Sequence, residues 1–411
     1  MTQYDLVIIG SGPGGRAAAI QAGKLKRRVL VIDRKDRFGG VSVHTGTIPS
    51  KTLRETVLNL SGWRERSFYG RSYRVKDEIG ADDLKMRLHK TLDYEVDVLE
   101  HQFNRNHVET MSGLARFISP NEVEVTADNG EVTTVAGAHF LIATGTYTYR
   151  PDTVPFNGTT ILDSDEFLEM SQIPRSLIVI GAGVIGVEYA TMFSALDVKV
   201  TLIEPRETFL DFIDKTLIQE FTHEIRENGV DLRLGSAVAK IEDCYSHVEV
   251  ALENGRHVRA EMLLFAAGRM GATQRLGLEA AGLTTDHRGR LNVDRKSYQT
   301  AVPHIYAVGD VNDLNPIVHL AIQQGEIAGY NATHPDVPQK EIDHRLDAEV
   351  VFTDPQVAVV GLNERACRAN GIPYLVASYP FADHGKALCR GDLHGFVKLL
   401  AAPSNGRLIG A

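Results

Sequence analysis

Two turns of the sequence contain glycines at the spacing that a bound dinucleotide requires. Each turn follows a short apolar run and precedes a predicted helix. In a G-x-G-x-x-G turn the first glycine permits the tight turn, the second lets the backbone approach a pyrophosphate, and the third lets the helix pack on the strand. The helix N-terminus then faces the diphosphate with its partial positive charge. The two sets are Gly10, Gly12 and Gly15 and, about 170 residues later, Gly181, Gly183 and Gly186.

An acidic residue follows each turn at the place where a ribose would need a hydrogen-bond acceptor. Asp33 ends the apolar run 28–33, and Glu204 ends the run 199–204. Glu204 would repel the 2′-phosphate of NADP and so favours NAD, whereas the guanidinium of Arg206 would suit that phosphate. The preference between NAD and NADP therefore stays open. Two such sites indicate one held and one exchanging cofactor, and hence electron transfer; the alternative is that one site has lost its ligand.

Further motifs carry a family resemblance. Together with the two glycine turns they resemble the two-dinucleotide flavoprotein disulfide reductases over nearly the whole chain. These motifs are Gly39-Gly40, IPSK at 48–51, Ala143-Thr144-Gly145, Ala266-Ala267-Gly268-Arg269, and YAVGD, which ends in Gly309 and Asp310.

The resemblance implies that the first domain holds FAD and that the second binds NAD or NADP(H) as exchanging substrates. It also implies that Asp310 contacts the ribityl chain of the flavin, and that His319 either contacts the flavin or is structural. The residues thus assigned to cofactor binding are Gly10, Gly12, Gly15, Asp33, Gly39, Gly40, Ser42, Thr47, Lys51, Ala143, Thr144, Gly145, Gly181, Gly183, Gly186, Glu204, Gly268, Gly309, Asp310 and His319.

The stretch GGVSVHTGTIPSKTLRE at 39–55 lacks the two cysteines of the dithiol-using members, and Ser42 and Thr47 occupy their positions. A hydroxyl forms neither a disulfide nor a thiolate, so the dithiol reactions are excluded. Within the family, VHTGTIPSK resembles the soluble pyridine-nucleotide transhydrogenases, although some of these keep a cysteine where Ser42 stands. Such enzymes move a hydride from NADPH through FAD to NAD⁺. This predicts a Si-specific NAD(P)⁺ transhydrogenase working by a ping-pong mechanism.

The resemblance assigns the catalytic role to a charged pair, Lys51 and Glu188. Lys51 is expected near the flavin, where a cation would stabilise developing negative charge. The alternative is an ordinary surface lysine. His44 is expected either to reach the nicotinamide pocket or simply to be hydrogen bonded within the fold.

Two other functions fit the same motifs. An open flavin can reduce a quinone without dedicated side chains, so a diaphorase-like NAD(P)H:quinone oxidoreductase is the alternative enzyme. A non-catalytic flavin- or nucleotide-binding paralogue is the alternative outside catalysis.

The order of apolar runs predicts an α/β chain with two Rossmann-like doubly wound dinucleotide-binding domains and an incomplete α+β interface domain. Alternation and the Asn129-Gly130 turn predict antiparallel strands over 105–140, and a second alternating segment spans 230–265. The expected domains are 1–150 for FAD with a helical excursion at 50–103, 151–270 for NAD(P), 271–340 as the return segment of the FAD domain, and 341–411 as the interface domain. A polar, Pro-containing stretch at 335–345 reads as a linker.

The composition of the chain limits which kinds of partner it is expected to bind. With 44 basic and 53 acidic residues the net charge of −9 argues against nucleic acid or an anionic membrane as a partner. The start of the chain shows no secretory signal, which predicts the cytoplasm. Cys244, Cys367 and Cys389 form no zinc or disulfide pattern, so neither a metal nor a disulfide is expected. A homodimer is expected for a full-length relative but is doubtful for a chain that ends at LIGA, inside an apolar strand.

Overall fold

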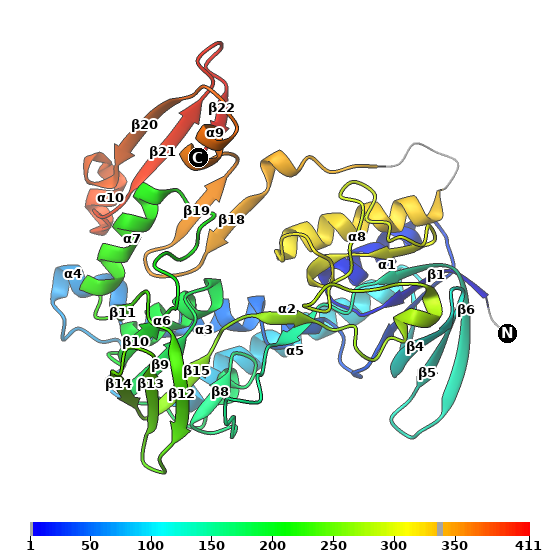
Figure 1. The fold of residues 1–411 in the computed structure, drawn as a ribbon, viewed down its shortest axis with the longest axis horizontal. Coiled ribbons are helices and arrows are strands. Elements are labelled where there is room, and N and C mark those ends of the chain that lie inside the picture. Colours follow the sequence, from blue (N-terminus) through cyan, green and yellow to red (C-terminus); the bar gives the residue numbers. More distant parts are fainter. Residues whose placement is uncertain (1–2, 335–339) are drawn as a thin grey trace. The chain divides into compact units, whose positions relative to one another are not determined.

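The computed structural model describes residues 3–334 and 340–411, and the chain forms two compact units (Figure 1). The first unit consists of the segments Met1–Ser50, Leu88–Thr148 and Arg269–Ile342. The second consists of Lys51–Arg87, Tyr149–Gly268 and Asp343–Ala411. Of the predicted linker 335–345, residues 335–339 lie outside the described part.

A parallel sheet forms the centre of the first unit. Its strand order is β3-β2-β1-β6-β17, so consecutive strands run outward from β1 in one direction and the chain then crosses to the other side. Both faces are covered, which explains why β1 and β2 are nearly continuous apolar runs. The strands are β1 (Gln3–Ile9), β2 (Val29–Asp33), β3 (Glu109–Ser112), β6 (Val132–Ile142) and β17 (Ile305–Ala307).

Two helices of this unit pack unusually closely. They are α1 (Pro13–Lys24), which opens at the first glycine turn, and α8 (Val318–Thr333). A Cβ atom added to Gly325 of α8 would lie 2.1 Å from the backbone oxygen of Gly14 in α1. Small residues at this crossing therefore bring the two helix backbones together and fix the start of α1.

The antiparallel prediction for 105–140 was partly wrong. The strand β4 (Leu114–Ser119) pairs antiparallel with β5 (Glu122–Thr126), and β5 pairs antiparallel with the first half of β6, as expected. However, β3 is parallel to β2, and the second half of β6 is parallel to β1. Alternation reports which side chains are buried but not the direction of the neighbouring strand, so it did not distinguish these cases.

A second parallel sheet lies in the other unit, with the order β11-β10-β9-β15-β8. Its first four strands follow the same order as β3-β2-β1-β6 of the first sheet, but its edge strand β8 precedes them in sequence, whereas β17 follows its sheet partners. Helix α6 (Val184–Ala195) opens at the second glycine turn and is buried from Gly186 to Ala195. The strands are β8 (Ile161–Asp163), β9 (Ser176–Ile180), β10 (Lys199–Ile203), β11 (Asp231–Arg233) and β15 (Met262–Phe265).

A three-stranded antiparallel sheet covers this unit on one side. It consists of β12 (Val238–Asp243), β13 (Val248–Leu252) and β14 (His257–Ala260). Its inner face contributes Ile241, Val250 and Val258 to the core shared with the parallel sheet. The alternation predicted over 230–265 is therefore that of a sheet with one buried and one exposed face.

The remaining elements complete an α+β region and the connections. They are α2 (Gly40–His44), α3 (Thr47–Leu60), α4 (Arg66–Tyr69), α5 (Ala81–Arg105), β7 (Thr146–Thr148), β16 (Arg269–Gly271), α7 (Lys215–Glu227), β18 (Ala348–Val351), β19 (Val357–Val360), α9 (Glu364–Ala369), β20 (Leu375–Pro380), α10 (Gly385–Arg390), β21 (Phe396–Ala401) and β22 (Leu408–Gly410). The α/β class with a separate α+β region is as predicted. Within the described ranges, no helix has the length and apolar character needed to cross a bilayer.

Candidate functional site

The first glycine turn has the geometry that a diphosphate needs. Gly10 has φ +106°, and a Cβ there would lie 2.3 Å from the carbonyl oxygen of Ala143. A Cβ on Gly15 would lie 2.0 Å from the oxygen of Gly10, whereas one on Gly12 would meet no atom within 4 Å. The outer glycines are therefore required by packing, and the middle one leaves its backbone open to a ligand.

The second turn repeats this geometry in the other unit. A Cβ on Gly181 would lie 2.7 Å from the oxygen of Ala266, and one on Gly186 would lie 1.8 Å from the oxygen of Gly181. Again the middle residue, Gly183, has open space around it. Neither α1 nor α6 has a side-chain cap at its N-terminus, so the amides of both first turns are available to an anion.

The two predicted acidic residues each clamp their glycine turn. Asp33 accepts hydrogen bonds from the backbone N–H of Ser11 at 2.8 Å and from the Ser11 hydroxyl at 2.5 Å. Glu204 accepts one from the N–H of Ala182 at 2.8 Å. Both carboxylates thus hold the residue between the first two glycines, and they lie at the ends of the second strands where a ribose acceptor was predicted.

Arg206 lies directly on Glu204. Its Nε donates to Glu204 Oε1 at 2.7 Å, and more than half of the Arg206 side chain is exposed. Burial raises the pKa of Glu204, but the hydrogen bonds from Arg206 and from the Ala182 N–H outweigh it and leave that pKa below its ordinary value. One carboxylate and one guanidinium therefore share the position at the end of β10 where the sequence predicts a ribose partner.

The YAVGD motif begins in β17 and continues past its end, where the side chain of Val308 would lie 2.8 Å from a Cβ added to Gly14 of α1. Asp310 keeps some exposure, yet burial raises its pKa, and the charges of Arg269 and Arg290 oppose that rise. Arg269 is positioned by two hydrogen bonds to Thr146, from Nε to Oγ1 at 2.9 Å and from Nη2 to the backbone oxygen at 3.1 Å. A carboxylate faced by two guanidinium groups can bind polar hydroxyls of a cofactor chain.

Residues that the sequence analysis did not single out support this loop. Gln324, on α8, accepts hydrogen bonds from the N–H of Gly309 at 2.8 Å and from the amide of Asn312 at 2.9 Å. Gln324 and Asn312 are almost completely buried. The sequence offers only a weak signal for Gln324, a polar residue on the apolar side of a helix directly after a glycine motif.

The cysteine-free stretch forms the short helix α2 and the start of α3. The Ser42 hydroxyl donates to the Gly39 oxygen at 3.2 Å, and the Thr47 oxygen accepts from the Ser50 hydroxyl at 3.3 Å. His44 Nε2 lies 3.2 Å from the oxygen of Arg37 and 3.0 Å from that of Phe38. Because carbonyls only accept, Nε2 carries the proton and fixes the loop before Gly39, which favours the structural interpretation of His44. All described cysteines are free.

The predicted pair, Lys51 and Glu188, is in contact. Lys51 Nζ lies 2.5 Å from Glu188 Oε2, and the Glu188 side chain is 4% exposed. The second oxygen of Glu188 accepts the N–H of Phe352 at 2.9 Å, and Lys51 lies over the Phe352 ring at 4.9 Å from its centroid. The Phe352 contacts were not anticipated, because they come from a segment about 300 residues away in sequence.

His319 lies at the start of a helix, and Gly145 and Gly268 each lie just after a strand. His319 is exposed in the first turn of α8. Gly145 and Gly268 both have positive φ and no atom within 4 Å of an added Cβ. Gly145 follows Ala143 and Thr144 directly after β6, and Gly268 follows β15.

The first unit fits a bound FAD. Two polar side-chain atoms, Thr144 Oγ1 and Arg290 Nε, are shielded from solvent and have no hydrogen-bond partner among the described residues. Thr144 lies in the loop after β6, next to the turn after β1, where the strand order reverses. Ligands of doubly wound folds bind at this reversal, where the first-turn amides and the open Gly12 also lie.

Comparison with known proteins decides the family. The model of the pyridine nucleotide-disulphide oxidoreductases matches residues 4–325, and the model of their dimerisation domain matches residues 348–411. The chain belongs to this oxidoreductase family. Proteins of the family bind FAD and NAD(P), in agreement with the two glycine turns described above.

Two curated relatives are named soluble pyridine nucleotide transhydrogenase. A soluble pyridine nucleotide transhydrogenase of Mycobacterium bovis (strain BCG / Pasteur 1173P2) is 41% identical over all 411 residues, which is 87% of the relative's length. One of Colwellia psychrerythraea is 35% identical over 99% of this chain and 86% of its own.

Solved structures share the fold over the whole chain. LpdA from Mycobacterium tuberculosis has a TM-score of 0.90 at 27% identity, and the match covers 100% of this chain and 89% of that one. The flavoprotein disulfide reductase RclA from Escherichia coli, in a copper(II) complex, has a TM-score of 0.88 at 26% identity with the same coverage.

Proposed function

We propose that this protein is a Si-specific NAD(P)⁺ transhydrogenase that moves a hydride from NADPH to NAD⁺ by a ping-pong mechanism. The proposal is supported by two observations together: both glycine turns have the geometry that a diphosphate needs, and Ser42 and Thr47 stand at the positions of the cysteine pair. The relatives named soluble pyridine nucleotide transhydrogenase support it.

The proposed domains follow the sequence motifs. Residues 1–150 and 271–340 would hold FAD, residues 151–270 would bind the exchanging nucleotide, and residues 341–411 would form the interface domain. Bound FAD would supply a carrier that takes up a hydride from one nicotinamide and returns it to another. The reaction NADPH + NAD⁺ → NADP⁺ + NADH is then balanced without a thiol or a net proton.

The chain's own residues would mainly position the reactants. The open backbone at Gly183 and the amides of α6 would hold the diphosphate of each nucleotide in turn, with Glu204 and Arg206 beside its ribose. Lys51 would contribute a positive charge, which Glu188 orients. Because each half-reaction transfers one hydride and releases no leaving group that needs a proton, proximity would supply most of the rate acceleration.

The decisive experiment supplies the purified protein with FAD and measures NADPH-dependent reduction of thio-NAD⁺ at a wavelength where only the thio product absorbs. Steady turnover with parallel-line kinetics is expected. If NADPH bleaches the flavin but thio-NAD⁺ is not reduced, the acceptor is not a nucleotide, and a quinone becomes the leading acceptor. If NADPH does not bleach the flavin at all, the protein is not an enzyme of this kind.

Homodimer formation and the cytoplasmic location stay predictions. One face of β20 and β21 exposes several apolar side chains, namely Leu375, Tyr379, Val397 and Leu399, and the matching family model is that of a dimerisation domain. Light scattering of the 411-residue chain tests the dimer directly.

A further inference from the structure

The outer face of the β12-β13-β14 sheet gathers three side chains with metal-binding atoms. Side chains alternate across a strand, so His247 and Glu249, two residues apart, point to the same side. The hairpin pairs Cys244 with His247 through a hydrogen bond from the N–H of Cys244 to the oxygen of His247 at 2.9 Å. Val248 and Val250 alternate with these residues and lie in the core. The register therefore places a thiol, an imidazole and a carboxylate together on the solvent side.

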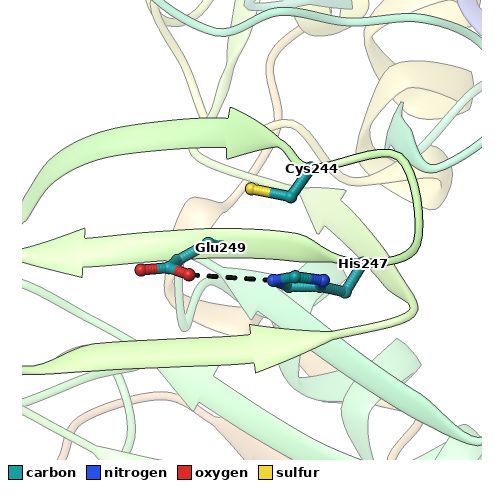
Figure 2. Close-up of side chains that lie close together, drawn as sticks. All are labelled: Cys244, His247 and Glu249. Atoms are coloured by element: carbon teal, nitrogen blue, oxygen red, sulfur yellow. Dashed lines mark ion pairs between the residues drawn. The ribbon is translucent and has the colours of Figure 1, made fainter.

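Their donor atoms already lie close together. Figure 2 shows the three side chains at the turn of the hairpin, Cys244 directly after β12, His247 directly before β13 and Glu249 within β13. The sulfur, one ring nitrogen and one carboxylate oxygen all lie within 4.8 Å of one another. His247 Nε2 is 3.7 Å from Glu249 Oε2. In residues 3–334 and 340–411 this is the one group of three or more such donors.

A tetrahedral zinc ion needs donors at a similar separation. Bonds of about 2.3 Å to sulfur and about 2.0–2.1 Å to nitrogen and oxygen put neighbouring donors roughly 3.4–3.6 Å apart. The distance between His247 Nε2 and Glu249 Oε2 is already close to this separation. The remaining closure of roughly 1 Å is within the reach of a rotation of the Cys244 side chain, which is exposed.

The imidazole of His247 has one ring nitrogen held by a neighbour and one that makes no hydrogen bond to the described residues, as in a metal-binding histidine. Its Nδ1 lies 3.1 Å from the hydroxyl of Ser246. Its other nitrogen, Nε2, is shielded from solvent and makes no hydrogen bond within the described part of the chain. A histidine that ligates a metal typically uses its other ring nitrogen for such a contact, which fixes the ring and its tautomer. The unpartnered nitrogen is the one that faces Glu249.

The carboxylate of Glu249 has two neighbours that offer nitrogen atoms, the imidazole of His257 and the guanidinium of Arg259. His257 Nδ1 lies 2.6 Å from Oε1, and Arg259 Nε donates to Oε2 at 2.7 Å. His257 can remain as an outer partner of the carboxylate when a metal is bound. Arg259 occupies the same oxygen as the ion would and repels it, so binding requires this guanidinium to move away from Oε2.

We propose that Cys244, His247 and Glu249 form a binding site for a divalent metal of the zinc class, with water as the fourth ligand. Thiolate, imidazole and carboxylate are the three ligand types of zinc in proteins. The sequence analysis expected no metal because it searched for paired cysteines, whereas here one hairpin brings single residues of three types together. The site is separate from the nucleotide turn, and its occupancy is measurable without turnover.

The test titrates the FAD-loaded chain with Zn²⁺ against a chromophoric chelator and records X-ray absorption of the bound zinc. One site is expected, with one sulfur at about 2.3 Å and lighter ligands at about 2.0–2.1 Å. Cys244→Ser should weaken binding on the order of 100-fold, and Ser246→Ala about 10-fold through the loss of the ring's outer partner. Arg259→Gln should tighten it. Cys389→Ser, at another exposed free thiol, is the matched control and should change nothing.

Alkylation of the unmodified protein gives a second readout that needs no variant. Zn²⁺ should slow the reaction of Cys244 with iodoacetamide while leaving that of Cys389 unchanged, as followed by peptide mass spectrometry. Equal zinc affinity in Cys244→Ser and the parent chain, or a zinc spectrum without sulfur, would overturn the proposal. Equal protection of both thiols would do the same.

Discussion

Removing the positive charge of Lys51 should slow flavin reduction and destabilise the fold, and the two effects can be separated. The carboxylate of Glu188 is almost completely buried and accepts two hydrogen bonds, one from Lys51 and one from the N–H of Phe352. Lys51→Met leaves this buried charge with only the second. Breaking a buried pair from one side costs about 3–5 kcal/mol, and because Lys51 is 27% exposed we expect the lower end, about 3 kcal/mol.

The kinetic effect has a different origin. Loss of one electrostatic group that stabilises developing charge typically costs about 10²–10³ in rate. Since Glu188 offsets part of the lysine's charge, we expect the lower end, about 10²-fold, or about 2.7 kcal/mol in the barrier. The assay is stopped-flow bleaching of the bound flavin by saturating NADPH, with FAD content measured separately.

The double variant Lys51→Met/Glu188→Gln distinguishes the two effects. The amide oxygen of the introduced glutamine can still accept the N–H of Phe352, and no charge is left buried. Most of the stability to urea should therefore return. Flavin reduction should stay slow. Lys240→Met is the control, since its pair with Glu242 has a similar distance, 2.6 Å, but is exposed, and it should shift stability by less than about 0.5 kcal/mol. A double variant that recovers both stability and rate would refute a role of Lys51 in hydride transfer.

Three further predictions follow from other contacts. Gly12→Ala should leave the fold intact, because no atom lies within 4 Å of the added Cβ, but it should weaken FAD binding as measured by equilibrium dialysis. Gly15→Ala places its Cβ 2.0 Å from a backbone oxygen and should reduce the yield of folded protein. Arg206→Ala should lower kcat/KM for NADPH about tenfold relative to NADH in steady-state assays, and an unchanged ratio would exclude this residue as the 2′-phosphate partner. Lys398→Met should cost about 3 kcal/mol of stability to urea at pH 7, since Lys398 is buried against Asp214 at 2.8 Å. Although burial alone would raise it, hydrogen bonds from Lys398 and Thr216 hold the pKa of Asp214 at about 2, and the hydrogen bond from Lys398 also lowers the pKa of Glu364. The difference from the parent should therefore be full above about pH 5 and should fade as the pH falls towards 2.

The sequence predicted best where one residue type satisfies one local requirement. The glycines of both turns and the acidic residues after them were placed correctly, because their spacing alone fixes a strand, a turn and a helix. The contact of Lys51 with Glu188 was also anticipated, but from family resemblance and not from spacing. The binding and catalytic roles of all these residues remain predictions.

What the sequence did not predict depends on long-range contacts. Nothing local indicates that Phe352 supplies an N–H to Glu188, or that Gln324 holds the loop at Gly309. The direction of β3 was predicted wrongly for the same reason, since its parallel partner β2 lies more than 70 residues earlier. The cluster at Cys244 was missed because it depends on the register of one hairpin.

The division of each unit into separate chain segments has a consequence for how the protein is made. In the first unit, β1 must wait for β17 to complete its sheet, and about 300 residues separate them. At a synthesis rate of about 5–20 residues per second, the ribosome needs roughly 15–60 s to deliver that strand. For all of this interval α1 lacks the helix against which it packs, and once β6 has been made its second half has an open edge of apolar residues until β17 arrives. A nascent chain of this design therefore needs protection from aggregation for most of its synthesis.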